Sequence, residues 1–243
     1  MKSKLLMSVL VVSLLLIAIA WVYAQPSSGD PIVEGFKITE VASVADAYEQ
    51  LYGEKNYMYH DMRPLFPTKF AGPAFTVYMK QEENKEGGKA VQGMLDAIDQ
   101  APAGSVYVMV LENGLDYGGL GGLMATAMKY RNLTGAVVDA SIRDTPQMRR
   151  LLFPVFGRGV APSTTVGHYR FVGMNIPVTC AGVKVNPNDI IVADEDGVCV
   201  VPRARAAETL KRAQQLDLTE HTTLALIERF KSIVKAVAQQ GRI

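Results

Sequence analysis

The sequence has few of the residues on which several common binding functions depend. Its 243 residues include only two cysteines, Cys180 and Cys199, and three histidines, His60, His168 and His221. Two cysteines cannot build a disulfide framework, and the cysteines and histidines do not have the spacing of a zinc site. The composition therefore excludes a small disulfide-stabilised scaffold and argues against zinc chemistry.

Net charge is also nearly absent. Lysine and arginine number 25 against 24 aspartates and glutamates, so the formal charge is +1. Removal of residues 1–24, which hold Lys2 and Lys4 and no acid, changes this value to −1. A nearly neutral protein lacks the basic surface that binding to a phosphate backbone requires, so we expect no nucleic-acid partner.

Long apolar runs are absent except at the N-terminus. Residues 1–4 carry two lysines, residues 5–22 are almost entirely aliphatic, and Ala24 precedes a position suited to signal cleavage. This pattern predicts a signal peptide over 1–24 and an exported protein, periplasmic or secreted, with no stable membrane association after cleavage. The alternative is a membrane anchor formed by residues 5–22, because this segment is at the lower length limit for crossing a bilayer.

The rest of the chain has the pattern of one domain. It shows no internal repeat and no long linker rich in proline, glycine or serine. We therefore expect a spacer over 25–37 and one domain over 38–243 that ends in a helical tail.

The apolar periodicity of this domain predicts an α/β fold. Helices are expected over 43–51, 86–100, 118–131 and 144–151, and strands over 70–79, 105–111 and 135–139. After Pro154 the pattern changes to short strands, expected over 154–160, 176–179, 182–185, 190–193 and 198–201. Two helices follow, over 202–216 and 219–239.

The last of these helices carries an apolar stripe, formed by Thr223, Ile227, Phe230, Val234 and Val237. Soluble proteins usually avoid an exposed patch of this size. We therefore expect either another subunit or folding back of the chain to cover the stripe.

A glycine cluster and an Arg-Asp pair form the segment best suited to chemistry. Gly118-Gly119-Leu120-Gly121-Gly122 precedes a predicted helix, where backbone amides and the helix dipole favour a carboxylate or phosphate. The cluster matches neither the phosphate-loop pattern nor the dinucleotide pattern. Arg143 and Asp144 lie where a predicted strand ends and a helix begins, a usual place for ligand sites in α/β proteins. One carboxylate with waters can hold Mg²⁺, and the guanidinium can bind a substrate carboxylate or keto oxygen.

At these residues the sequence resembles a known family. The similar segments are residues 43–47, 72–77, 121–127, 135–144, 154–159, 177–183, 187–189 and 193–198. They resemble the family that joins the 4-hydroxy-4-methyl-2-oxoglutarate aldolases with the regulator of ribonuclease activity A proteins. The resemblance covers about residues 38–243.

The resemblance implies a swivelling β/β/α domain with C-terminal helices, assembled as trimers or hexamers with sites between subunits. Enzymes of this family use a divalent metal, Mg²⁺ or Mn²⁺ or another such ion, to cleave 4-hydroxy-2-oxo dicarboxylates to pyruvate, and often decarboxylate oxaloacetate. The implied catalytic residues are Arg143, which binds the 2-oxo acid substrate, and Asp144, the metal ligand. The implied substrate-binding loop, which holds the pyruvyl carboxylate by its amides, is Gly121, Gly122, Leu123 and Met124.

Two departures from the family pattern affect the expected activity. Gly122 stands where many of the enzymes have Glu or Asp, and Ala140 replaces a frequent Gly. The missing acid could have oriented a metal-bound water, so decarboxylation, which needs no base, is the better supported reaction. The alternative function is non-catalytic protein binding, as in the ribonuclease regulators.

Other polar residues have competing interpretations. Glu112 and Asp116 could approach the site from the loop before the glycines, and His168 and Arg170 could reach a substrate's distal carboxylate from a polar loop. For each of these four residues a solvated position is the alternative. Cys180 and Cys199 are expected to be buried thiols, and a disulfide between them stays open.

Overall fold

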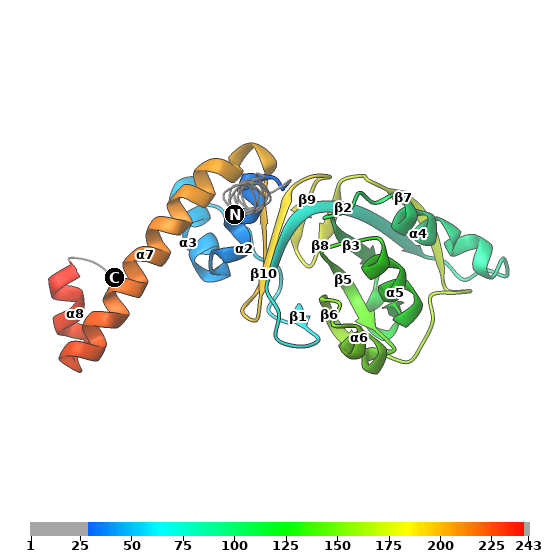
Figure 1. Ribbon diagram of the computed structural model, residues 1–243. Helices are drawn as coiled ribbons and strands as arrows, with labels where there is room; N and C mark the ends of the chain where they lie inside the picture. The colour runs from blue at the N-terminus through cyan, green and yellow to red at the C-terminus, as the bar shows by residue number, and fades with distance from the viewer. Residues whose placement is uncertain (1–28, 241–243) are drawn as a thin grey trace, which may run out of the picture. The chain divides into compact units, whose positions relative to one another are not determined.

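The computed structural model describes residues 29–240 and shows a mixed α/β fold with C-terminal helices (Figure 1). The signal peptide and anchor predicted over 1–24 and 5–22 lie outside the described residues. Within 29–240, no helix combines the length and the apolar character needed to cross a membrane. From Ile32 onward the chain forms one unit.

A nine-stranded sheet forms the frame, with the order β1-β6-β5-β3-β2-β10-β11, β4 beside β5 and β7 beside β2. Its strands are β1 (Arg63–Pro64), β2 (Phe70–Gln81), β3 (Val106–Leu111), β4 (Gly118–Leu120), β5 (Gly135–Ile142), β6 (Val155–Val160), β7 (Tyr169–Met174), β10 (Ile190–Asp194) and β11 (Gly197–Val201). A separate antiparallel pair consists of β8 (Val178–Cys180) and β9 (Val183–Val185).

The long strand β2 joins the two halves of the sheet. Its first residues pair antiparallel with β10, where Ala71 lies opposite Val192, and its last residues pair antiparallel with β7, where Gln81 lies opposite Tyr169. Strands β2, β3, β5 and β6 run parallel, so their carboxyl ends meet at one edge. In open α/β sheets this edge is where ligands bind.

Helices cover one face of the parallel strands (Figure 1). They are α4 (Gly88–Gln100), α5 (Gly122–Tyr130) and α6 (Thr145–Leu151). Tyr107, Met109 and Val138 are buried against them, because alternate residues of a strand point to the same face. Tyr107 also donates a hydrogen bond to the carbonyl of Met94 at 2.8 Å, and burial raises the pKa of its hydroxyl.

The opposite face of the sheet packs beneath the β8–β9 pair. Val108, Val137 and Phe156 are buried there, in one cluster with Cys180 and Val185. Successive side chains of each parallel strand therefore point alternately to the helix-covered face and to the face beneath β8 and β9, as the predicted βαβ order requires.

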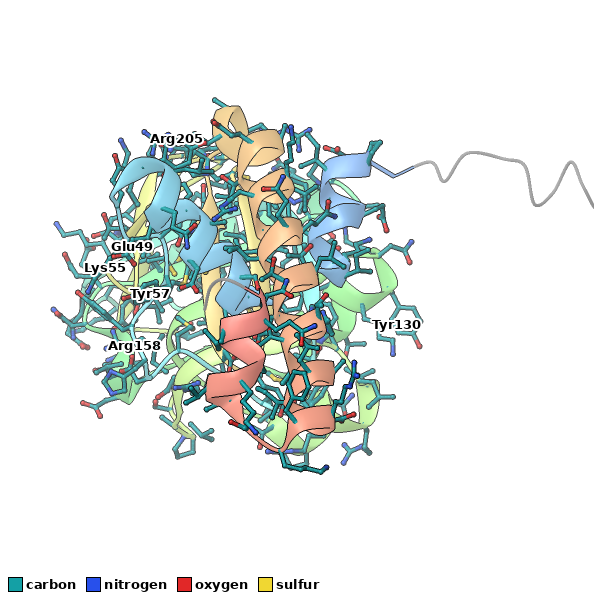
Figure 2. All side chains as sticks on the ribbon, turned by 90° about the vertical axis from the view of Figure 1, so that its left-hand side faces the viewer. Glu49, Lys55, Tyr57, Tyr130, Arg158 and Arg205 are labelled. Carbon is teal, nitrogen blue, oxygen red and sulfur yellow. The ribbon has the colours of Figure 1, made fainter. Side chains whose placement is uncertain are left out.

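A third cluster packs helices on β10 and β11. The helices are α2 (Pro31–Ile38), α3 (Val41–Tyr52) and α7 (Ala206–Phe230). Arg205, which directly precedes α7, connects α7 to α3 and to the residues after it. Its Nη1 donates to Glu54 Oε2 at 2.8 Å and to the Tyr48 hydroxyl at 2.6 Å. Figure 2 shows Arg205 at the end of α7 next to α3, and its guanidinium lies 4.3 Å from the centroid of the Tyr52 ring.

Two expectations about the N-terminal half are corrected. The predicted spacer over 25–37 includes most of α2, where Phe36 is fully buried, so residues 31–37 belong to the packed structure. The helix expected over 118–131 begins only at Gly122, because residues 118–120 form β4 and pair with β5.

The C-terminal half differs from the prediction in three places. Residues 169–174, expected in a loop, form β7 because they pair with β2. The two helices expected over 202–216 and 219–239 are instead the continuous α7 and the short α8 (Ile233–Gln240). The break comes at Lys231, which has a left-handed φ of 50°.

Folding back of α8 covers part of the apolar stripe. Ile227, Phe230 and Val237 become half-buried, whereas Val234 stays 75% exposed and its neighbour Ile233 61% exposed. Of the two outcomes that the sequence left open, folding back therefore accounts for part of the stripe.

Both cysteines are buried free thiols, as expected. Cys180 lies in the cluster beneath β8 and β9, and Cys199 lies in the cluster of α2, α3 and α7. Burial raises the pKa of both thiols. The two cysteines do not pair, because they belong to different cores.

Candidate active site

The predicted site residues converge at the carboxyl end of β5. Arg143 and Asp144 follow the last residue of this strand, and Gly121 and Gly122 join β4 to α5. The Arg143 amide donates to the Leu120 carbonyl at 3.0 Å, which connects the two segments. The sheet thus brings together two short motifs that are separated by about twenty residues of sequence.

Asp144 has a strained backbone that directs its carboxylate. Its φ of 57° and ψ of 33° lie in the left-handed region, which costs most non-glycine residues about 1–3 kcal/mol and which Asp tolerates better than most. Asp144 is the N-cap residue of α6, yet its side chain does not cap that helix. Its Oδ2 instead accepts a hydrogen bond from the Gly122 amide of α5 at 2.9 Å.

The glycines allow this close approach. A Cβ at position 121 would lie 2.9 Å from Asp144 Oδ2 and 3.2 Å from Arg143 Nε, so Gly121 leaves room for both functional groups. Gly122 has a different environment, because its nearest neighbour would be the flexible Gln147 side chain, with Cγ at 3.0 Å. The glycine cluster is therefore needed for packing as well as for a ligand.

The start of α5 supplies backbone amides to the site. Gly122, Leu123 and Met124 carry the first amides of this helix, which have no acceptor within it, and the helix dipole adds partial positive charge. The Leu123 side chain is 89% exposed, whereas Met124 is buried in the core. These two residues can therefore bind an anion through the backbone, while the Gly122 amide is already bonded to Asp144.

Arg143 is held loosely. Its Nη1 donates to the Ser163 carbonyl at 3.3 Å, and its Nε lies 3.9 Å from Asp144 Oδ2. The side chains of Arg143 and Asp144 are 38% and 53% exposed. Because a guanidinium has five N–H donors, Arg143 has donor capacity left for a ligand.

A hollow of about 370 Å³ lies beside Asp144. It is lined by Gly122, Leu123, Asp144, Pro146, Gln147 and Arg150. The sequence interpretation missed Gln147 and Arg150. Gln147 and Arg150 are three residues apart in α6, so they are neighbours on one side of the helix that follows Asp144, and this signal could have identified them.

Glu112 and Asp116 do not join this hollow. Glu112 Oε2 accepts from the Gln81 amide at 3.2 Å, and Glu112 lines a different hollow together with Asp139. Asp116 lies in the short turn η1 (Gly114–Asp116), and its carbonyl accepts from the Ser163 hydroxyl. Their contacts are thus structural.

His168 and Arg170 are engaged in ion pairs on the surface. His168 Nδ1 lies 2.7 Å from Glu83 Oε1, and Arg170 pairs with Glu82 at 2.7 Å and with Glu86. These contacts agree with the solvated alternative for both residues.

The residues of the site fit a divalent metal held by one carboxylate. Among residues 29–240, no group of three or more His, Cys, Asp or Glu side chains could surround an ion. Mg²⁺ in proteins is often bound by one or two carboxylates, with waters and substrate oxygens in the remaining positions. The half-exposed Asp144 carboxylate, at the border of an open hollow, can take part in such an arrangement.

Two curated relatives match more than half of the chain. Protein DlpA of Legionella pneumophila is 32% identical over 152 residues, which are 63% of this chain and 24% of DlpA. A protein of Halalkalibacterium halodurans, provisionally named 4-hydroxy-4-methyl-2-oxoglutarate aldolase, is 32% identical over 147 residues, 59% of this chain and 65% of that protein. The chain thus spans less than two thirds of either relative.

Solved structures share the fold over most of the chain. RraAS2 of Streptomyces coelicolor, described as an unusual member of the RNase ES inhibitor RraA protein family, is 25% identical with a TM-score of 0.74, over 84% of this chain and all of that chain. An uncharacterized protein of Pseudomonas syringae is 24% identical with a TM-score of 0.76, over 87% of this chain and 99% of the other.

The family match agrees with the resemblance seen in the sequence motifs. A profile of the RraA-like family, described as Aldolase/RraA, matches residues 41–200. This range contains the glycine cluster, the Arg143–Asp144 pair and all strands except the end of β11. The chain is therefore a member of the Aldolase/RraA family.

Proposed function

We propose that the protein is a divalent-metal-dependent carbon–carbon lyase that acts on 2-oxo dicarboxylates. Decarboxylation of oxaloacetate to pyruvate is the better supported reaction, and aldol cleavage of 4-hydroxy-4-methyl-2-oxoglutarate type substrates is the second. One observation carries the proposal: Arg143 and a strained Asp144 meet the first amides of α5 at the carboxyl end of β5. The provisional aldolase name of the H. halodurans relative supports the reaction class.

Each residue of the site has a distinct role in this reaction. Asp144 would hold Mg²⁺ or Mn²⁺, which as a Lewis acid supplies polarisation of the keto group. Arg143 binds a substrate oxygen and offsets the negative charge that develops when the C3–C4 bond breaks. The Leu123 and Met124 amides bind the carboxylate next to the keto group.

Gly122 determines which of the two reactions is favoured. Aldol cleavage requires a group that takes the proton from the 4-hydroxyl, and Gly122 has no side chain to provide or orient one. Loss of CO₂ from oxaloacetate needs no such group. The site is therefore better equipped for decarboxylation than for aldol cleavage.

The test is pyruvate release from oxaloacetate with and without Mg²⁺. Because free metal ions also promote this decarboxylation, Asp144→Asn at the same Mg²⁺ concentration is the matched control. We expect turnover that a chelator abolishes and that the variant lacks. Equal rates with the protein and with the variant would refute the proposal.

A non-catalytic binding protein is the second candidate. Exposed large apolar side chains on α5 and directly after α6 favour it, since Leu123, Tyr130 and Leu152 are 89%, 79% and 71% exposed. Tyr130 projects away from the ribbon in Figure 2. The same pyruvate assay separates the two candidates, because only the enzyme shows metal-dependent turnover.

We also propose that these apolar side chains contact another copy of the chain in a trimer or hexamer. Light scattering of the purified protein tests this assembly, and an active monomer would refute a shared site. Export remains a proposal based on residues 1–24. Fractionation of the native host tests it, and a full-length chain in the cytoplasm would contradict it.

A further inference from the structure

One side of α6 continues the candidate site beyond Asp144. Asp144, Gln147 and Arg150 are spaced by three residues, and all three line the hollow next to Gly122. Arg150 is the one cationic side chain among the six lining residues. The hollow therefore has an acidic group at one end of α6 and a basic group at the other.

The Arg150 side chain is held toward the hollow. Its Nη2 donates a hydrogen bond to Gln147 Oε1 at 2.7 Å. Side chains of an α-helix lean toward its N-terminus, so this contact directs the guanidinium toward the Asp144 end. The backbone positions of Asp144 and Arg150 are six residues apart, which corresponds to a rise of about 9 Å along a helix. Because the Arg150 side chain extends toward Asp144, a ligand that contacts both side chains has to span less than this distance.

The charge of Arg150 is not balanced by a carboxylate. Arg158 and Arg170 each pair with two acidic side chains, whereas no ion pair within residues 29–240 includes Arg150. Basic residues in the last turn of a helix commonly interact favourably with the partial negative charge at the C-terminal end of the helix dipole. Arg149 occupies the same turn without lining the hollow, so a dipole role alone does not account for the position of Arg150.

We propose that Arg150, positioned by Gln147, binds the C5 carboxylate of substrates with a 2-oxoglutarate skeleton and makes the site selective for them over 2-oxo monocarboxylates of equal length. Aldol cleavage between C3 and C4 retains this carboxylate in the product, whereas the distal carboxylate of oxaloacetate leaves as CO₂ and is not the group that Arg150 binds. This inference depends on the proposed function, because the Asp144 end must hold the 2-oxo acid group. A guanidinium binds a carboxylate through two parallel hydrogen bonds. A monocarboxylate of equal length would leave it unpaired, and sites built for a polar group discriminate strongly against ligands that lack it.

Two unreactive ligands of equal chain length test the selectivity. 2-Oxoglutarate has a distal carboxylate, 2-oxopentanoate has a methyl group in its place, and neither has the 4-hydroxyl needed for cleavage. Binding of each to the Mg²⁺-loaded full chain is measured by calorimetry. We expect preference for 2-oxoglutarate, reduced about tenfold or more in Arg150→Gln, with unchanged affinity for 2-oxopentanoate.

Arg149→Gln is the matched control, since it removes the same charge from the same turn of α6. It should leave the preference unchanged. Gln147→Ala should reduce the preference less than Arg150→Gln, because it removes only the positioning contact. Equal loss of preference in the Arg149 and Arg150 variants would overturn the inference, as would no change in Arg150→Gln.

Oxaloacetate turnover separates this inference from the proposed function. If the protein decarboxylates oxaloacetate but its ligand preference is independent of Arg150, the inference fails and the lyase proposal stands. If 2-oxoglutarate binds in an Arg150-dependent way without any turnover, the binding role stands and the lyase proposal fails. If neither ligand binds, the inference fails, and the lyase proposal fails with it only when oxaloacetate is not turned over either.

Discussion

Two arginine–aspartate groups of this protein lie near the same edge of the sheet and differ in almost every physical respect. Arg158 binds Asp61 through Nε and Nη2 at 2.8–3.1 Å and Asp139 through Nη1 at 3.0 Å. Arg143 lies 3.9 Å from Asp144 and makes one long hydrogen bond to a carbonyl. The side chain of Arg158 is 19% exposed and that of Arg143 38% exposed.

The difference separates the structural role of Arg158 from the chemical role that we propose for Arg143 and Asp144. The Arg158 group connects β5, β6 and the segment before β1, and Asp139 Oδ2 also accepts from the Ala181 amide at 2.6 Å. The guanidinium of Arg158 and the carboxylates of Asp61 and Asp139 are thus hydrogen-bonded to other groups of the protein. Arg143 and Asp144 keep donor and acceptor capacity on an open surface, and Asp144 has a strained backbone besides. Strain and incomplete pairing at an exposed position are typical of residues that act on a ligand.

The largest expected effect is the loss of activity in Asp144→Asn. Asn keeps the size of the side chain and tolerates the left-handed backbone, but it removes the negative charge that would hold the proposed metal. We expect kcat/KM to fall by about 10²- to 10³-fold and Mg²⁺ affinity to fall in calorimetry, with little change in Tm. Unchanged Mg²⁺ affinity would remove Asp144 from the metal site.

Arg158→Met should have the next largest effect, on stability. Asp139 is largely buried and Asp61 is 35% exposed, so removing their shared partner should cost less than about 3 kcal/mol, the loss that is typical of a fully buried pair. Denaturant unfolding measures this loss, and the activity of the protein that stays folded should not change. A variant as stable as the parent would contradict the structural role of Arg158.

Arg143→Met should show the reverse pattern. The pair with Asp144 is long and exposed, so its loss should change the free energy of unfolding by less than about 1 kcal/mol. The reaction should slow by about 10²-fold, because the developing negative charge loses a donor. A stability loss as large as that of Arg158→Met would erase the distinction between the two groups.

Gly122→Asp should change the ratio of aldol cleavage to decarboxylation severalfold in favour of cleavage. Gly122 is helical and does not have a positive φ, so the backbone accepts a side chain there. A Cβ at position 122 would lie 3.0 Å from Gln147 Cγ and 3.2 Å from Asp144 Cβ, and the double variant with Gln147→Ala removes the closer of these contacts. Because Gln147→Ala by itself should weaken the binding of dicarboxylates, the double variant is compared with Gln147→Ala alone. A fall of both rates relative to that single variant would rule out this role for an acid at position 122.

The smallest effect concerns acid stability. Hydrogen bonds from Arg158 lower the pKa of Asp61 below its ordinary value, so the ionised form is favoured in the folded state. Its contribution is present above the unfolded pKa of about 3.9 and is lost as the pH falls through the folded pKa. Because Asp61 is partly exposed, we expect less than about 1 kcal/mol. In Asp61→Asn this part of the pH dependence should disappear, whereas Asp144→Asn should retain it.

Much of the fold could be predicted from local patterns. The strands β2, β3, β10 and β11 are visible as short runs of mostly apolar residues, because both of their faces are buried. The helices α3 and α4 follow from apolar residues at helical spacing. The short elements β4 and β7 were not predicted. Neither has a strong pattern of its own, and each forms because a distant strand offers hydrogen bonds to its backbone.

The site divides in the same way. Residue types and motif spacing in the sequence predict Gly121, Gly122, Arg143 and Asp144 as site residues, because a glycine-rich helix start and a charged pair at a strand end are local features. Only the tertiary structure could show that Asp144 reaches across to α5, that Arg158 is committed to two carboxylates while Arg143 is not, and that Arg150 faces the same hollow. These properties depend on distances between segments far apart in the chain, and local sequence patterns do not encode such distances.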